Sequence, residues 1–547
     1  MTAAPAPETA PVDEYVPVLI AGAGPAGLTL ALLLDRLGVP FLLVERRTGP
    51  SALPRSRAVN TRTMEVLRHL GLADEVTGAA LAQERVGLRF AFAPTLASLS
   101  GPDAVLARHV AAGRRADHSP VTTVLCPQDV VEDVLRRRVP TTRVRYGHAL
   151  GDLEQTDEHL TATVTGPGGR TYRVRCGHLV GCDGAHSAVR RATGVRLRGG
   201  GPVTENHQLL FEAPLGPLFG ELRASNTFLH SDGVRGYLQP TSVPDRWTFN
   251  RLLEGAPDPT PLDPADVVRT VAGDPALPVK VLEESHWTSR SEVAERMTVG
   301  RVHLAGDAAH LVTPFSGSGL NLGVQDVHNL AWKLAAVVHG WAGPGLLATY
   351  DPERRPVAER TADEDRTNNA AAVATGNWDR WRAELPKRLV KDGLILGFHY
   401  PQGALVPEAD DPAAPADPVT DSRADYRPSA RPGHRAPHLP LGPGPDAASV
   451  LDLFGLGFTL LTGAAGTVWT AAAHHVQQRL SVPLHTRVLG PGTAEIDPNW
   501  TRTYGITGSG AVLVRPDGHV AWRRTTGGPD AAALLERALR TVLSRPE

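Results

Sequence analysis

The spacing of apolar residues changes twice within the first fifty positions of the chain. Residues 16–21 form a continuous apolar run, residues 28–37 have the apolar content of a helix, and residues 41–44 form a second short apolar run. A strand that is apolar on both faces is typical of a covered parallel sheet. The pattern therefore predicts a strand, a helix and a second strand, which is the start of a doubly wound α/β domain.

A different pattern occupies the middle of the chain. Residues 235–240 (RGYLQP) and 245–253 (DRWTFNRLL) approach period-two alternation of polar and apolar positions. Such alternation favours an antiparallel sheet with one face packed and the other turned toward a ligand or solvent. We therefore expect residues 196–282 to form a β-rich domain inserted into the first one.

The last hundred residues combine short apolar runs with an amphipathic segment. Residues 450–463 and 510–523 are strand-like, and residues 531–543 (AAALLERALRTVL) predict a closing helix. Proline and aspartate dominate the stretch before them, which is typical of a linker. The expected divisions are a disordered N-terminus at 1–14, a discontinuous first domain at 15–195 and 283–400, the insert at 196–282, the linker at 401–446, and a third domain at 447–547.

Composition narrows the class of protein. The chain has 547 residues, a net charge of −2 and three cysteines. The balanced charge predicts no nucleic-acid or membrane partner. The few cysteines fit the reducing cytoplasm, and the first fourteen residues lack the basic and apolar regions of a signal peptide. We expect a cytoplasmic protein that is a monomer or a homodimer.

The glycine pattern after the first predicted strand is the most specific motif. Gly22, Gly24 and Gly27 form G-x-G-x-x-G, and Glu45 ends the second strand. In such a unit the glycines allow a tight turn and the close approach of a pyrophosphate, while the acid accepts from a ribose hydroxyl. The chain carries one such unit, so it holds one dinucleotide firmly, and any second dinucleotide must bind without this device.

Two further motifs follow. D-G-x-x-S-x-V-R begins at Asp183 and ends at Arg190, and in residues 300–334 a strand-like run reaches Asp307, then a Pro- and Gly-rich loop and an apolar helix. A loop without side chains lets a flat or phosphorylated ligand approach the backbone, and N–H groups at the start of the next helix can donate to it. Asp307 stands where the carboxyl ends of parallel strands bind ligands, and a helix N-cap is its alternative role.

These three motifs, in this order, resemble the flavin-dependent aromatic hydroxylases, the single-component class A monooxygenases. Residues 55–72 and 126–138 are also similar, so the resemblance covers most of residues 15–360. Residues 350–361 and 512–523 extend it to the phenol-hydroxylase-like branch, which includes polyketide-tailoring enzymes. The resemblance implies an α/β fold with a Rossmann-like FAD-binding domain, an inserted β-rich substrate domain and a C-terminal thioredoxin-like domain.

The resemblance also implies a cofactor site. In the family, the second and third motifs lie near the pyrophosphate of FAD, the Pro-Gln pair before a helix contacts the ribityl side, and the segment of Arg55 passes beneath the flavin. Arg46 could flank the adenine. The expected cofactor-binding residues are Gly22, Gly24, Pro25, Ala26, Gly27, Glu45, Arg46, Arg55, Gln128, Asp183, Asp307, Pro314, Gly317, Gly319, Leu320 and Asn321.

Ordinary structural roles compete at several of these positions. Asp183 and Gly184 also fit a simple turn between a strand and a helix, and Arg190 also fits a solvated helix residue. Thr313 and Ser316 replace the first Pro and the first Gly of the family's usual loop. The loop therefore departs from the family pattern at these two positions.

The insert supplies the candidate substrate residues. Phe228, His230, Tyr237 and Trp247 are expected to line a pocket, and ordinary sheet packing is the alternative for each. No motif identifies a catalytic residue. C-x-x-C and H-E-x-x-H are absent, so no metal site is predicted, and the third domain has no cysteine for dithiol chemistry.

The implied reaction uses FAD, NADPH or NADH as a transient co-substrate, and O2. A C4a-hydroperoxide of the reduced flavin would transfer one oxygen atom to a phenolic ring. We therefore expect an aromatic hydroxylase acting on a polycyclic polyketide, as in antibiotic biosynthesis. Two alternatives stay open: a Baeyer–Villiger or ring-cleaving monooxygenase on the same scaffold, and a flavin-binding module without turnover.

Overall fold

The computed structural model describes most of the chain. The described residues are 13–49, 56–80, 89–101, 104–108, 117–219, 226–253, 262–314, 317–373, 391–408, 423–444, 447–490 and 496–545. Residues 1–14 were expected to be disordered, and residues 1–12 of that segment lie outside the described residues. No helix within the described ranges combines the length and the apolar character that a membrane span requires.

The first domain is built on a mainly parallel sheet. Its parallel strands follow the spatial order β17-β10-β1-β2-β7, and α1 connects β1 to β2. These elements are β1 (Glu14–Ala21), α1 (Pro25–Arg36), β2 (Phe41–Glu45), β7 (Val144–Tyr146), β10 (Thr171–Gly181) and β17 (Val302–Leu304). The predicted strand, helix and strand at the start of the chain are therefore confirmed.

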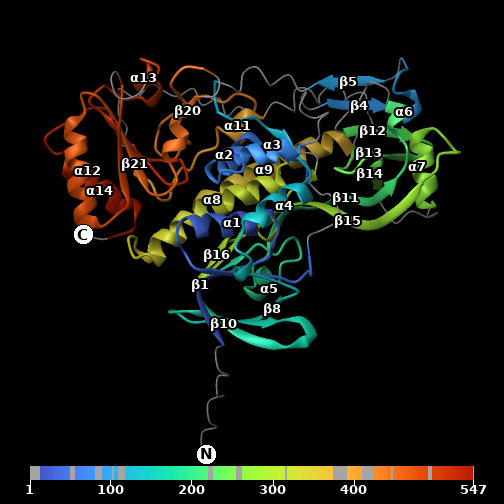
Figure 1. Ribbon diagram of the computed structural model, residues 1–547, viewed down its shortest axis with the longest axis horizontal. Helices are drawn as coiled ribbons and strands as arrows, with labels where there is room; N and C mark the ends of the chain where they lie inside the picture. The colour runs from blue at the N-terminus through green and yellow to red at the C-terminus, as the bar shows by residue number, and fades with distance from the viewer. Residues whose placement is uncertain are drawn as a thin grey trace, which may run out of the picture.

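Helices from distant parts of the chain cover this sheet. The core between them contains fully buried residues of β1, β10, α1 and the long helix α8 (Gly319–Val338). The other helices of this domain are α2 (Thr61–His69), α3 (Ala73–Ala79), α4 (Gln128–Arg138), α5 (Ala188–Ala192) and α9 (Tyr350–Val373). In Figure 1, α8 crosses the middle of the molecule beside α1, α2 and α9.

The insert forms a second large sheet. The strand order is β18-β15-β11-β14-β13-β12-β4-β5. The bounds are β4 (Arg89–Ala93), β5 (Val105–Arg108), β11 (Leu197–Glu212), β12 (Asn226–Ser231), β13 (Val234–Pro240), β14 (Arg246–Leu253), β15 (Lys280–Ala294) and β18 (His310–Leu311). The antiparallel pairing predicted from the alternation at 235–253 is present, because β13 and β14 are antiparallel neighbours. Figure 1 shows this sheet at the right, with α7 (Pro264–Ala272) on its outer side.

The predicted boundaries of the insert need a correction. Residues 89–93 and 105–108 were placed in the first domain, but they form β4 and β5, the last two strands at one end of the insert's sheet. β4 joins by parallel pairing to β12, which is far away in the sequence. Local alternation cannot reveal such a partner, because it reports only which residues share a face.

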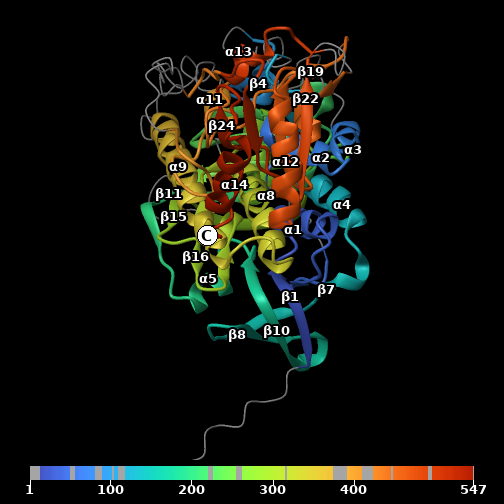
Figure 2. The same ribbon diagram turned by 90° about the vertical axis from the view of Figure 1, so that its left-hand side faces the viewer.

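The third domain has a four-stranded sheet in the order β22-β21-β23-β24. β21 (Phe458–Gly463) and β22 (Leu484–Leu489) are parallel and joined by α12 (Thr467–Leu480), whereas β23 (Ala511–Val514) and β24 (Val520–Arg524) are antiparallel and precede α14 (Ala531–Val542). This is the βαβ-then-ββα order of a thioredoxin-like domain. Figure 2 shows α12 and β22 toward the viewer.

This domain packs on the first one through a shared apolar core. Trp332 of α8 and Trp341 lie in the same buried cluster as Phe458 and Trp469 of the third domain. The ring of Phe458 meets that of Trp332 edge-on at 5.7 Å between centroids. The stretch predicted as a linker is also partly core, because Ala436 and its neighbours are buried against the third domain. The high proline content of this stretch favoured a linker, so these apolar contacts were not predicted.

Candidate cofactor and substrate site

The three sequence motifs meet at one edge of the parallel sheet. Gly22 has a φ of +104°, and a Cβ there would stand 2.4 Å from the carbonyl oxygen of Cys182. The backbone N–H of Ala305 donates to the carbonyl oxygen of Gly181 at 3.0 Å. The carboxyl ends of β1, β10 and β17 are therefore adjacent, which is where open α/β sheets bind ligands.

The three glycines of the first motif differ in what surrounds them. A Cβ at Gly27 would lie 1.9 Å from the carbonyl oxygen of Gly22, so protein packing alone requires glycine there. A Cβ at Gly24 would meet no heavy atom within 4 Å. Gly24 is also the N-cap of α1, with Pro25 as the first helical residue and no side chain capping the helix. Open space beside uncapped N–H groups is what a pyrophosphate cradle requires.

Glu45 holds the glycine turn from the end of β2. Its Oε2 accepts from the backbone N–H of Ala23 at 2.8 Å, and its Oε1 accepts from that of Arg47 at 2.9 Å. Arg46 is exposed on the turn that follows. Arg55 lies outside the described residues. The ribose contact expected of Glu45 and the adenine contact of Arg46 remain predictions.

Asp183 stabilises the turn between a strand and a helix, which is the structural role predicted as its alternative. Its Oδ2 accepts from the backbone N–H groups of Ala188 at 2.7 Å and Val189 at 3.1 Å, at the start of α5. Its Oδ1 is buried and has no hydrogen-bond partner in the described part of the chain. Because buried polar atoms are normally paired, this oxygen fits a site that is completed by a ligand.

Asp307 lies on a short 3-10 turn and faces the start of α8. Its Oδ1 is 3.8 Å from the position that a Cβ would take at Gly319. Ser318 is the N-cap of α8, and its own side chain makes no capping hydrogen bond. A carboxylate beside the start of a helix fits a ligand that offers both hydroxyl and acceptor groups. Both the cofactor contact and the helix-cap role of Asp307 stay predictions.

Asn321 fixes the glycine-rich loop to the segment after residue 55. Its Oδ1 accepts from the backbone N–H of Asn60 at 2.8 Å, and its Nδ2 donates to the carbonyl oxygens of Ala58 at 2.7 Å and Gly317 at 2.8 Å. Only 1 % of Asn321 is exposed. Its side chain therefore positions the loop, and only its backbone remains to contact a cofactor.

The remaining predicted cofactor residues surround the same loop. Leu320 packs on Val66 of α2, and Pro314 is exposed at the entry of the loop. Gln128 begins α4, and its backbone N–H donates to the carbonyl oxygen of Ser56 at 2.8 Å. Ala26 of α1 lies 3.4 Å from the position of a Cβ at Gly306. The contacts given above connect the glycine turn, the segment after residue 55 and the glycine-rich loop, and the cofactor contacts of these residues stay predictions.

Three buried charged residues behind the third motif were missed by sequence reasoning. The Oδ2 of Asp326 is 2.6 Å from Nε2 of His310 and accepts from the backbone N–H of Gly306 at 3.1 Å. Its Oδ1 accepts from Nε of Arg354 at 2.9 Å. Burial would raise the pKa of Asp326, but the charges of His310 and Arg354 outweigh it and lower that pKa. Asp326 stays ionised and fixes the turn that carries Asp307.

Arg190 also belongs to this site's support. It is 8 % exposed and donates to the carbonyl oxygen of Ala308 at 2.9 Å and that of Ala185 at 2.8 Å. It is therefore not a solvated helix residue. It connects the second motif to the third.

The insert's sheet turns one face toward the first domain. Ser291 of β15 donates to the carbonyl oxygen of Ala362 in α9 at 2.8 Å, and Val293 packs against the same helix. Side chains alternate along a strand and share a face across paired positions. By that alternation and the strand register, Phe228 and Tyr237 lie on the α9 side of the sheet.

Phe228 and Tyr237 belong to an aromatic cluster on that face. The ring of Phe228 stacks on Phe92 at 5.0 Å and on Phe90 at 6.3 Å, and it meets Tyr237 at 5.8 Å. His230 is exposed further along β12 on the same side. Burial raises the pKa of Tyr237, so its phenol is neutral and serves as a hydrogen-bond donor.

Trp247 requires a correction. It lies opposite Pro240 and two residues from Phe249, on the same face, and the side chain of Phe249 packs in the core beneath α7. Trp247 stacks on Phe219 at 5.1 Å, and its Nε1 donates to the carbonyl oxygen of Ala213 at 3.1 Å. Trp247 is therefore a packing residue on the outer face of the sheet. Alternation alone could not assign it, because the sequence does not say which face of the sheet is the outer one.

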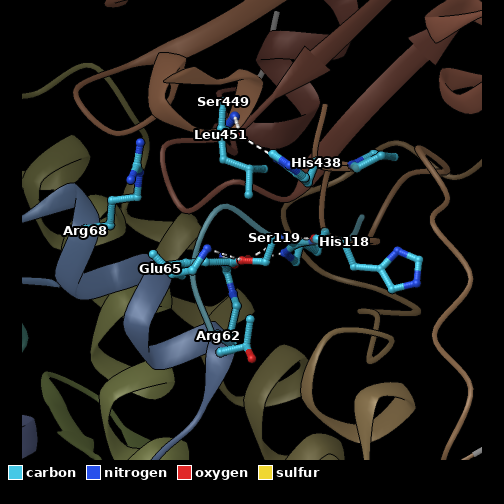
Figure 3. Close-up of polar contacts among 12 residues, drawn as sticks. Arg62, Glu65, Arg68, His118, Ser119, His438, Ser449 and Leu451 are labelled. Carbon is cyan, nitrogen blue, oxygen red and sulfur yellow. Dashed lines mark hydrogen bonds and ion pairs between the residues drawn. The ribbon is translucent and has the colours of Figure 1, made fainter. Parts of the chain in front are cut away.

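A buried polar cluster connects α2 to the third domain (Figure 3). Glu65 of α2 accepts from Arg62 at 2.8 Å and from the hydroxyl of Ser119 at 2.7 Å. Arg435 donates to both carboxylate oxygens of Glu65, and Arg62 donates to the carbonyl oxygen of Asp517 at 2.7 Å. Nearer the surface, His438 bonds the hydroxyl of Ser449 at 2.8 Å.

A glycine turn at the adjoining carboxyl ends of β1, β10 and β17 is typical of the dinucleotide-binding α/β proteins, and that is the class to which the fold and the site assign this chain. Family comparison agrees. Residues 15–365 match the family described as FAD binding domain, and residues 429–546 match the one described as aromatic-ring hydroxylase, C-terminal. The chain belongs to the FAD-dependent aromatic-ring hydroxylases, which are monooxygenases.

Individual proteins are similar over the whole chain. Aklavinone 12-hydroxylase RdmE of Streptomyces purpurascens is 36 % identical over 97 % of this chain and 100 % of its own. Among solved structures, the flavin-dependent monooxygenase PieE with FAD and substrate has a TM-score of 0.87 at 33 % identity, covering 98 % of this chain and 100 % of that one. Aklavinone-11 hydroxylase with FAD and aklavinone has a TM-score of 0.84 at 34 % identity, covering 97 % and 100 %.

Proposed function

We propose that this enzyme hydroxylates a polycyclic phenolic substrate of the aromatic polyketide type, using NADPH or NADH and O2. The observation that carries the proposal is the position of the aromatic cluster. β18, which begins three residues after Asp307, pairs with β15 of the insert's sheet. The loop that would hold the flavin and the sheet that bears Phe228 and Tyr237 are therefore joined directly.

The shape and polarity of that face suit a flat substrate with oxygen substituents. Stacked aromatic rings bind another flat ring by offset or edge-on contact. On the same face, Oδ1 of Asn206, Nε1 of Trp287 and Oγ of Ser289 are buried without a hydrogen-bond partner in the described part of the chain. A phenol hydroxyl and a ring carbonyl would supply the missing acceptor and donor groups.

When bound, FAD supplies the activation of O2 and the oxygen atom that reaches the substrate. The chain's own residues hold the cofactor loop and orient the substrate. Asp326 and Arg190 hold the turn of Asp307, Asn321 holds the glycine-rich loop, and the sheet presents the substrate's ring from the opposite side. Exclusion of water from the reacting groups favours oxygen transfer over loss as peroxide.

The relatives support the substrate class by analogy. RdmE is named as an aklavinone hydroxylase, and a protein from Streptomyces glaucescens that is 34 % identical over 97 % of this chain is named tetracenomycin A2 monooxygenase-dioxygenase. Both named substrates come from other proteins, so the ring system and the position oxygenated here are for experiment to establish.

The test is incubation of the FAD-loaded enzyme with NADPH, ¹⁸O-labelled O2 and a panel of aromatic polyketides. We expect a product that gains one labelled oxygen on a ring carbon, with substrate-dependent consumption of NADPH. A lactone or a cleaved ring would move the assignment to Baeyer–Villiger or ring-cleaving oxygenation. NADPH consumption that yields only hydrogen peroxide with every aromatic compound would overturn the substrate class, and no consumption at all would indicate a flavin-binding module.

A further inference from the structure

Two histidines and a glutamate meet on the outer part of the insert's sheet, away from the aromatic face. His207 of β11 lies directly opposite His286 of β15, and Glu284 precedes His286 by two residues on the same face. By strand register His207 shares its side with Leu209, which packs in the core beneath α7. The three side chains therefore lie on the opposite side of the sheet from Phe228 and Tyr237.

The donor atoms are already close together. Nε2 of His207 is 3.0 Å from Oε1 of Glu284, and Nε2 of His286 is 3.6 Å from the same oxygen. The two imidazole rings are parallel, with an interplanar angle of 1° and centroids 4.5 Å apart. All three ligand atoms lie within 4.8 Å of one another, and among the described residues this is the one group of three or more ligating side chains that does so.

These separations fit a tetrahedral transition metal. With Zn–N and Zn–O bonds near 2.1 Å, two ligand atoms of a tetrahedron stand about 3.4 Å apart. The separations of 3.0 and 3.6 Å lie on either side of that value, and a rotation of the exposed ring of His286 out of its parallel stack on His207 would let both ring nitrogens point at one ion. Two imidazoles and one carboxylate are a ligand set that holds Zn²⁺ while leaving the fourth position to water.

The charges around the group permit a cation. Glu284 brings a carboxylate to the group, which favours a cation there. Arg251 faces His207 from β14 and opposes a cation. Glu284 and His286 are 44 % and 64 % exposed, so an ion can enter from solvent.

We propose that His207, Glu284 and His286 form a binding site for Zn²⁺ or a similar borderline transition-metal ion, with water as the fourth ligand. The ion would join β11 to β15, the two strands by which the insert is connected to the first domain. Its role is to stabilise the pairing of these two strands. It takes no part in oxygen transfer, because the sheet separates it from the flavin side.

The test uses zinc chloride with the FAD-loaded, tag-free, EDTA-treated enzyme, in calorimetric titration and in thermal unfolding. We expect one Zn²⁺ per chain and a melting temperature that rises with Zn²⁺ but not with Mg²⁺, which prefers oxygen ligands. His286→Ala and Glu284→Gln change exposed side chains, so both should fold. His286→Ala should weaken Zn²⁺ binding by at least about tenfold, and Glu284→Gln should weaken it less.

His475→Ala is the matched control, because it removes an exposed histidine of α12 far along the chain. It should bind Zn²⁺ as the wild type does. The proposal is overturned if wild type and His286→Ala give the same titration, or if the wild type binds no Zn²⁺ at all. Equal FAD content in every variant verifies that folding is unchanged.

Discussion

Arg435 and Glu65, 370 positions apart in the chain, form a buried two-pronged ion pair that fastens the third domain to α2. Their side chains are 0 % and 2 % exposed. From Glu65, α2 runs back to its N-cap, Asn60, whose backbone N–H donates to Asn321 of the glycine-rich loop at 2.8 Å. A short series of contacts thus connects the third domain to the cofactor site.

Replacing Arg435 with Met should destabilise the enzyme strongly. The substitution leaves the carboxylate of Glu65 buried with only Arg62 and Ser119 beside it, and breaking a buried pair from one side costs about 3–5 kcal/mol. The measurement is the urea midpoint of the FAD-loaded enzyme. The control is Arg68→Ala: Arg68 also pairs α2 with the third domain, through Asp452, but is 33 % exposed. Its loss should cost no more than about 1 kcal/mol, and equal effects of the two variants would contradict this account.

Acid should weaken the same contact. Burial would raise the pKa of Glu65, but the charges of Arg435 and Arg62 outweigh it and lower that pKa from 4.5 to about 2. A carboxyl with a depressed folded-state pKa stabilises the protein fully above its unfolded-state pKa and loses that contribution as pH falls through the folded value. The contribution of Glu65 is therefore lost between pH 4.5 and about 2.

Glu65→Gln tests this dependence. The variant should be less stable than wild type at neutral pH, yet its urea midpoint should fall less steeply with pH through the acid range, because the titrating group is gone. Parallel curves for the two proteins would show that other carboxyls, such as Glu353 beside Arg515, account for the acid sensitivity.

The sequence predicted the strand, glycine turn and helix of the first motif because that motif is local. A glycine turn between a strand and a helix fixes both the backbone and its ligand within a few residues, so Gly22, Gly24 and Gly27 could be assigned from spacing alone. The buried partners Asp326, Arg354 and Arg190 were not assigned. Each acts on a backbone group distant in the sequence, and a charged residue that faces the core looks the same in the sequence as one that faces water.

The faces of the insert's sheet show a second limit. Alternation established that Phe228 and Trp247 each share a face with their second neighbours, but it could not say which face meets the first domain. That choice depends on the pairing of β11, β13 and β14 and on the contact of β15 with α9. The strand β4 was assigned to the wrong domain because its partner β12 is distant in the sequence.

Substitutions at the two glycines Gly24 and Gly27 should separate cofactor binding from folding. Gly24→Val should fold and lose FAD, because its side chain would occupy open space that is needed by the pyrophosphate. Gly27→Val should fail to fold, because its Cβ would lie 1.9 Å from a backbone oxygen. Circular dichroism and FAD titration of both variants provide the comparison, and a Gly24→Val enzyme that remains yellow would contradict the cradle.

Asp307→Ala should weaken FAD binding without disturbing the fold. Loss of a hydrogen bond to a charged group costs about 1.5–3 kcal/mol, which corresponds to about a tenfold to hundredfold rise in the dissociation constant. The exposed position of Asp307 makes the change structurally mild. Asp307→Asn keeps an acceptor and should lose less. An unchanged dissociation constant in both variants would remove Asp307 from the cofactor site.

The two faces of the insert's sheet should respond differently to substitution. Phe228→Ala removes a ring that stacks on Phe92, on the side turned toward the first domain. If that cluster binds the substrate, the loss of one aromatic contact, worth about 0.5–1.5 kcal/mol, should raise KM about twofold to tenfold while FAD affinity stays the same.

Trp247→Phe keeps a ring against Phe219 but loses the hydrogen bond from Nε1 to Ala213. That variant should be slightly less stable and keep its KM. Steady-state NADPH consumption with a substrate that the enzyme hydroxylates measures KM, and thermal unfolding measures stability. A rise in KM for Trp247→Phe equal to that for Phe228→Ala would mean that the substrate does not approach from the α9 side, and the aromatic cluster would then be ordinary packing.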